Sequence, residues 1–196
     1  PKKLILVANT AIPIGKFVSL DDLRWHRMIA QSGWSGRVIT AYRPDAVVDP
    51  EFAGFAENLA QFGALTGEDC STWTGYLAAH RKRRAYFIGF GATSSDHGHP
   101  TARTENLPPA EAEALFDRVK GGQASAEEAD CFRGQMLTEM ARMSLDDGLV
   151  LQIHPGSVRN HSGAMLARFG RDKGFDIPSR TDYVHALRPL LDAFGT

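Results

Sequence analysis

Short apolar runs alternate along the chain with longer segments whose apolar residues recur at helical spacing. The runs are too short for helices and rich in branched residues, so they predict buried strands over residues 4–8, 37–42, 86–95 and 149–153. The segments between them predict helices over residues 19–31, 50–62, 71–84, 108–120, 125–144 and 178–194. Strands that alternate with helices indicate a single α/β domain over residues 1–196, with a parallel sheet and right-handed crossovers.

Polar side chains follow the last three predicted strands. Residues 42–45 read Tyr-Arg-Pro-Asp, residues 95–98 read Ser-Asp-His-Gly, and His154 ends the fourth strand, with Arg159 in the loop behind it. Because parallel α/β sheets bind ligands at the carboxyl ends of their strands, we expect a functional site there. A strand that merely happens to end in a histidine remains the alternative interpretation of the segment around His154.

His97 and His99 have a spacing that can hold a metal ion, because alternate residues of an extended chain face the same way. Two ligands are too few for a metal site. The methionines at positions 136, 140 and 143 fall at helical spacing and favour core packing over contact with a cofactor.

Composition narrows the classes of function. With 43% hydrophobic and 23% charged residues, the chain is typical of a globular protein with one substantial core. A net charge of −1 gives no electrostatic case for nucleic acid or an anionic membrane. We interpret the basic run at residues 81–84 as the last turn of a helix, where it complements the helix dipole and stays in solvent.

The chain shows no apolar run long enough to span a bilayer and no signal-peptide pattern, so we expect a cytoplasmic location. Cys70 and Cys131 are isolated thiols without metal-like spacing, and we expect both to be reduced.

The strand-end motifs, together with Asp-Asp-Leu-Arg-Trp-His at residues 21–26 and Gln-Ile-His-Pro-Gly-Ser-Val-Arg-Asn at residues 152–160, resemble the middle of a uronate (glucuronate) isomerase. That family belongs to the amidohydrolase superfamily and folds as a distorted (β/α)8, or TIM, barrel. The resemblance runs from about Ser19 to the C-terminus and includes the spacing between the motifs. Residues 1–18 fit poorly, because Asn-Thr-Ala-Ile-Pro-Ile-Gly stands where the family has a Thr-Thr-Asp-like strand end.

The resemblance implies an aldose–ketose isomerisation, of D-glucuronate to D-fructuronate or of D-galacturonate to D-tagaturonate. Such a reaction needs an acid/base, a group that stabilises an oxyanion and a partner for the substrate carboxylate. By the family pattern, Arg43 would bind substrate, and His154 and His97 would be the catalytic histidines. Arg159 and Asp96 would add substrate contacts or support.

The family's metal motifs, a His-x-His at the first barrel strand and an Asp-Ser-Arg at the last, do not occur in this sequence. The His97/His99 pair is not their equivalent, because it lies on a middle strand. The resemblance therefore implies a divalent metal ion, zinc, in the full-length enzyme, with its ligands outside this chain.

The sequence corresponds to about four of the eight β/α units of such a barrel. A half barrel has two open strand edges, so we expect a fragment that pairs with another copy or with the remainder of the barrel, and that does not turn over uronate alone. Two alternatives remain: a non-catalytic, sugar-acid-binding half barrel, and a metal-dependent amidohydrolase.

Overall fold

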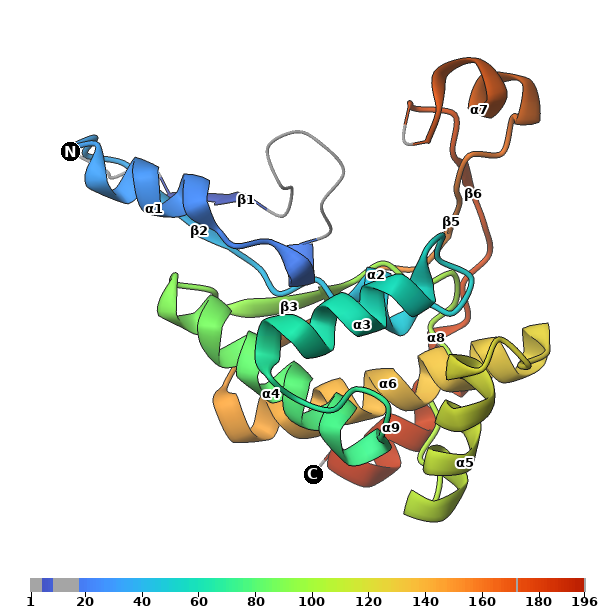
Figure 1. The fold of residues 1–196 in the computed structure, drawn as a ribbon. Coiled ribbons are helices and arrows are strands. Elements are labelled where there is room, and N and C mark those ends of the chain that lie inside the picture. Colours follow the sequence, from blue (N-terminus) through green and yellow to red (C-terminus); the bar gives the residue numbers. More distant parts are fainter. Residues whose placement is uncertain (1–4, 9–17, 172, 196) are drawn as a thin grey trace.

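A computed structural model describes residues 5–8, 18–171 and 173–195 (Figure 1). Strand β1 (Ile5–Ala8) pairs in parallel with β2 (Arg37–Thr40), and β3 (Ser94–His97) pairs in parallel with β4 (Val150–Ile153). A parallel bridge between Tyr42 and Ser95 joins the two pairs. The strands therefore follow one another in chain order, which confirms the predicted α/β class with parallel strands. Part of the N-terminal strand and the loop over residues 9–17 lie outside the described residues.

Seven helical segments, two of them begun by a side-chain cap, precede β4 in the described part of the chain. They are the 3-10 turn η1 (Val18–Leu20), α1 (Arg24–Gln31), α2 (Asp45–Val48), α3 (Phe55–Thr66), α4 (Trp73–Gly89), α5 (Pro109–Lys120) and α6 (Ala126–Asp147). Thr72 caps α4 by accepting a hydrogen bond from the amide of Gly75, and Ser125 forms a capping box with Glu128 at the start of α6. No helix within the described ranges is long and apolar enough to cross a membrane.

The strand predicted over residues 86–95 is largely wrong. Residues 86–89 continue α4, and β3 begins only at Ser94. The reason is that Tyr76, His80, Arg83 and Phe87 are all buried and recur at helical spacing, so the apolar run extends the buried face of the helix.

The prediction that the basic run stays in solvent holds for Arg81 and Lys82, which are exposed, and is wrong for the next two arginines, because α4 continues beyond them. Arg83 is buried and donates to the carbonyl oxygens of Ser19 and Asp21 at 2.9 and 2.7 Å. Arg84 is fully buried and bonds Asp147 at the end of α6. These two arginines therefore tie α4 to neighbouring segments, because a guanidinium can satisfy several buried acceptors at once.

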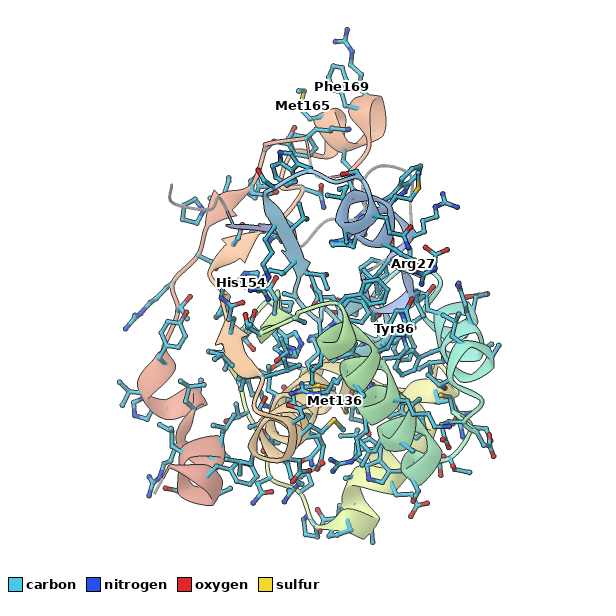
Figure 2. All side chains as sticks on the ribbon, turned by 90° about the vertical axis from the view of Figure 1, so that its left-hand side faces the viewer. Arg27, Tyr86, Met136, His154, Met165 and Phe169 are labelled. Atoms are coloured by element: carbon cyan, nitrogen blue, oxygen red, sulfur yellow. The ribbon has the colours of Figure 1, made fainter. Side chains whose placement is uncertain are left out.

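A two-stranded arm follows β4 in place of the loop expected there. Strand β5 (Ser157–Val158) pairs with β6 (Ile177–Pro178) in antiparallel fashion, and α7 (Gly163–Phe169) lies between them. The arm rises away from the body in Figure 1 and carries the exposed Met165 and Phe169 at its tip in Figure 2. The single helix expected over residues 178–194 is instead two short ones, α8 (Tyr183–Ala186) and α9 (Arg188–Phe194), and α9 packs against α6.

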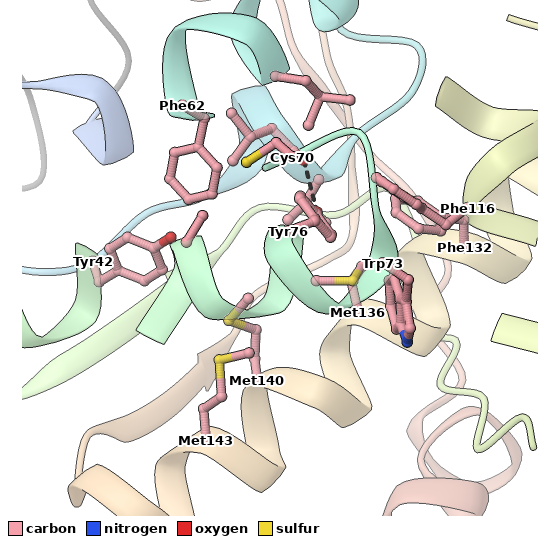
Figure 3. Packing of buried hydrophobic residues seen from close by; sticks show 14 of the residues in the cluster. Tyr42, Phe62, Cys70, Trp73, Tyr76, Phe116, Phe132, Met136, Met140 and Met143 are labelled. Carbon is pink, nitrogen blue, oxygen red and sulfur yellow. Dashed lines mark hydrogen bonds between the residues drawn. The ribbon is translucent and has the colours of Figure 1, made fainter. Parts of the chain in front are cut away.

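The core lies between the helices and one face of the sheet. Aromatic rings of α4, α5 and α6 pack together, with Tyr76 stacked on Phe116 at 4.8 Å between centroids (Figure 3). The three methionines of α6 are fully buried beside them, which confirms their predicted core role. On β4, Leu151 points toward the core and is half-buried, whereas Val150 points the other way and is 63% exposed. The face of the sheet that points away from the helices is therefore open.

Candidate active site at the strand ends

The backbone aligns the carboxyl ends of β2, β3 and β4. The Tyr42 amide donates to the Ser94 carbonyl at 3.0 Å, and the Asp96 amide donates back to the Tyr42 carbonyl at 2.8 Å. The His154 amide donates to the His97 carbonyl at 3.3 Å. Polar residues that are far apart in the sequence therefore end at the same edge of the sheet.

The alternation of side chains along each strand then selects which residues share a face. Tyr42 and His97 are fully buried on the side of the helices. Arg43 follows Tyr42 and Asp96 precedes His97, so both project to the open face, since successive residues of a strand point to opposite sides. His154, on the next strand, projects to the same face. The buried phenol of Tyr42 is held by a 2.7 Å hydrogen bond between its hydroxyl and Nδ1 of His80, which fixes the end of β2 against α4.

A row of charged groups results on the open face. Asp96 Oδ1 lies 2.8 Å from His154 Nε2, and Asp96 Oδ2 lies 3.7 Å from Arg43 Nη1. Arg43 Nε in turn donates to Asp45 Oδ2 at 2.7 Å. Two carboxylates thus alternate with an imidazole and a guanidinium, as expected where opposite charges offset one another.

Exposure differs along this row in a way that suits chemistry on a ligand. The Asp96 side chain is only 6% exposed, whereas Arg43 is 29% and His154 42% exposed. The carboxylate can therefore orient the two cationic or proton-carrying groups without reaching the solvent itself. Because an ionised carboxylate only accepts hydrogen bonds, Nε2 of His154 is the donor, and Nδ1 takes no part in this contact.

The structure does not bring His97 into this row. Its side chain is fully buried, with Nε2 3.1 Å from Ser95 Oγ and its ring 5.7 Å from the ring of His99. Burial, and then the neighbouring His99 and Arg84, lower the pKa of His97 well below its ordinary value, so the imidazole is neutral. The proposed catalytic role of His97 stays a prediction.

Arg159 lies on the arm, where its Nη1 is 3.3 Å from Asp176 Oδ2. The structure therefore gives this guanidinium a carboxylate partner within the arm, and its expected role in substrate binding also stays a prediction.

Two residues of the site were not predicted from the sequence. Asp45 bonds Arg43 and also accepts from the Gly98 amide at 3.2 Å. Its position two residues after Arg43, at the end of a strand, was the available signal. Gly98 lies against Arg43 and His154, and nothing local in the sequence marks it.

The family model for glucuronate isomerase matches residues 2–196. The chain belongs to the glucuronate isomerase family. Among curated members, the uronate isomerase of Rhizobium meliloti is 71% identical over 177 residues, which are 90% of this chain and 38% of that protein. The uronate isomerase of Xanthomonas campestris pv. campestris (strain B100) is 66% identical over 190 residues, 97% of this chain and 39% of that protein.

Solved structures of the family have the same fold. The crystal structure of glucuronate isomerase from Caulobacter crescentus has a TM-score of 0.89 at 52% identity and covers 99% of this chain. The uronate isomerase of Thermotoga maritima has a TM-score of 0.87 at 23% identity, and that likeness concerns the fold alone. This chain spans about two fifths of each of these two chains, 39% and 41%.

The residues described here do not fit the metal ion that the family resemblance implies. Within those parts of the chain, no group of three or more histidine, cysteine, aspartate or glutamate side chains is arranged to hold a metal. His97 and His99 are both buried, with their ring centroids 5.7 Å apart.

Proposed function

We propose that this chain is the central part of a uronate isomerase and carries about four β/α units of its TIM barrel. The enzyme would interconvert an aldehyde-form hexuronate, such as D-glucuronate or D-galacturonate, with its 2-keto isomer, D-fructuronate or D-tagaturonate. The observation that carries the proposal is the row formed by His154, Asp96 and Arg43 at the strand ends of a chain of this family.

The chemistry is a proton transfer between two neighbouring carbons. A base removes the proton from C2, the electron pair forms the C1=C2 bond, and the C1 carbonyl oxygen becomes the oxyanion of an enediolate. The hydroxyl proton of O2 is then transferred to O1, which becomes a hydroxyl, and the proton taken from C2 returns to C1 as O2 becomes the new carbonyl oxygen. A positioned acid/base accelerates such a reaction by about 10²–10⁴-fold, and stabilisation of the oxyanion contributes more to the rate.

The row supplies both tasks. His154 takes and returns the proton, with Asp96 holding the ring by the 2.8 Å hydrogen bond to Nε2. Arg43 binds the substrate carboxylate or the enediolate oxygens, because the forked donors of a guanidinium match two oxygens at once. Asp96 also lies near Arg43, so one buried carboxylate orients both groups.

The remainder of a longer polypeptide would complete the barrel. The chain spans 38% and 39% of the lengths of two of its curated relatives, and the open sheet face carries the exposed Val150. An exposed apolar side chain on the sheet and an open strand edge favour association with further strands or with a second copy. In the full-length enzyme we place the divalent metal ion, zinc, on residues outside this chain. The cytoplasmic location expected from the sequence stays a prediction.

The test replaces the matching 177 residues of the Rhizobium meliloti relative by those of this chain and measures conversion of D-glucuronate and D-galacturonate. We expect the chimera to be active and the His154→Gln variant to lose at least about 10²-fold in kcat. His185→Gln is the matched control, because the His185 side chain is 86% exposed and its ring bonds Asp182, three residues earlier on the surface. The kcat of His154→Gln should therefore lie far below the kcat of His185→Gln.

An inactive chimera beside an active parent would overturn the proposed function, and an unaffected His154→Gln variant would overturn the role of His154. The 196-residue chain alone should not turn over uronate. Binding without turnover, in a chain that assembles into dimers, would instead favour the sugar-acid-binding half barrel.

A further inference from the structure

The guanidinium of Arg43 occupies a space that exists because residue 98 has no side chain. A Cβ atom on Gly98 would lie 2.6 Å from Arg43 Nη2, 3.0 Å from Asp45 Oδ2 and 3.4 Å from His154 Cε1. The first of these distances is shorter than any ordinary contact with a carbon atom. Any side chain at position 98 would therefore displace the Arg43 guanidinium.

The backbone at this position does not itself require glycine. Gly98 is absent from the glycines with positive φ, so an alanine can adopt the same conformation. The space beside Arg43, and not a turn conformation, is what the missing side chain provides.

Asp45 holds the same guanidinium from another side. Its Oδ2 accepts from Arg43 Nε at 2.7 Å, and its Oδ1 accepts from the Gly98 amide at 3.2 Å. The carboxylate is only 18% exposed, so this charge-assisted hydrogen bond is partly shielded from water. One side chain thereby connects the loops that follow β2 and β3.

We propose that Gly98 and Asp45 are positioning residues for Arg43. Asp45 fixes the guanidinium through Nε, and Gly98 leaves the space in which Nη2 lies, so that Nη1 comes to rest near Asp96. The proposal rests on the proposed function, since it assigns to both residues the task of aiming the guanidinium that binds the hexuronate. A group that orients a reacting substrate loses much of its effect when it is displaced by about 1 Å.

Gly98→Ala separates positioning from folding. The atom that the new methyl group would meet first is the far end of a flexible side chain, which can rotate away, so the fold should survive. Gly89→Ala is the matched control, because a Cβ on Gly89 would meet nothing within 4 Å. Asp45→Asn adds no non-hydrogen atom and removes the negative charge that holds Arg43, so it tests the same contact without a larger side chain.

The first measurement follows the side-chain Nε–H signal of Arg43 in the ¹⁵N-labelled chain, assigned by its loss in Arg43→Lys. We expect this signal to move in Gly98→Ala, to exchange its proton with water faster in Asp45→Asn, and to stay unchanged in Gly89→Ala. Thermal unfolding of each variant shows whether the fold is kept. An Arg43 signal that is the same in all variants would overturn the proposal.

The second measurement is isomerase activity in the chimera described above. Gly98→Ala should lower kcat/KM by about 10²-fold, mostly by raising KM, while Gly89→Ala leaves both constants within about twofold. A displaced Arg43 signal with unchanged kcat/KM would overturn the positioning role. If the chimera itself is inactive, the proposed function fails, while the Arg43 signal still decides whether Gly98 and Asp45 hold the guanidinium.

Discussion

Asp146 and Asp147 are consecutive residues at the end of α6, and each is paired with an arginine of α4 at 2.6 Å. Arg81 and Asp146 are 46% and 61% exposed, whereas the Arg84 side chain is 0% exposed. The two pairs have the same closest distance and connect the same helices, but they differ in burial and in their hydrogen bonds, because Arg84 also donates from Nη2 to Asp147 Oδ1 at 2.8 Å. Replacing each aspartate by alanine compares a buried pair that has two hydrogen bonds with an exposed pair that has one.

Asp147→Ala leaves the buried Arg84 with much weaker partners. Its hydrogen bonds to the Ser144 hydroxyl at 3.0 Å and to the Met140 sulfur at 3.6 Å would remain. Leaving a buried charge without its counter-charge costs about 3–5 kcal/mol, while an exposed pair contributes about 0–1 kcal/mol. For a chain of this size we expect Asp147→Ala to lower Tm by roughly 6–20 °C and Asp146→Ala by at most about 4 °C.

Urea unfolding followed by tryptophan fluorescence gives the free energy of unfolding for each variant. The double variant Arg84→Met with Asp147→Leu should recover most of the loss, because apolar residues of similar size often replace a buried ion pair without cost. If the two alanine variants differ by less than about 1 kcal/mol, the reasoning from burial is refuted.

A pH series and two substitutions of phenylalanine test the core. Burial lowers the pKa values of His80, His97 and His99, so the unfolded chain binds more protons below its ordinary histidine pKa of 6.5. The free energy of unfolding should therefore hold above about pH 6.5 and fall below it, by about 1.4 kcal/mol per pH unit for each such imidazole, and a flat urea profile from pH 7 to about pH 5 would contradict this. Phe132→Ala should cost about 3–5 kcal/mol, because the ring is fully buried. Phe169→Ala, 47% exposed on the arm, should cost less than about 1 kcal/mol, and equal losses would show that the aromatic cluster is not the main core.

Structural features that depend on a few neighbouring residues could be predicted from the sequence. Helical spacing of apolar residues predicted a helix from Ser125, and α6 begins at Ala126, while the alternation of strands with helices predicted the parallel pairing. Arg43, Asp96 and His154 were predicted at strand ends and lie together in the structure. These successes share a cause, since periodicity and the chemistry at the end of a parallel strand are both local properties.

Features that depend on contacts between distant segments could not be predicted in this way. All four residues of β3 are polar, so no alternation of polar and apolar residues showed that Asp96 joins the charged row while His97 faces the helices. The burial of Arg84 depends on Asp147, sixty-three positions away. The role of Gly98 is visible only once Arg43, from another strand, lies against it. A side chain's partners across the sheet are set by the packing of whole elements, and packing of that kind leaves little trace in the residues next to it along the chain.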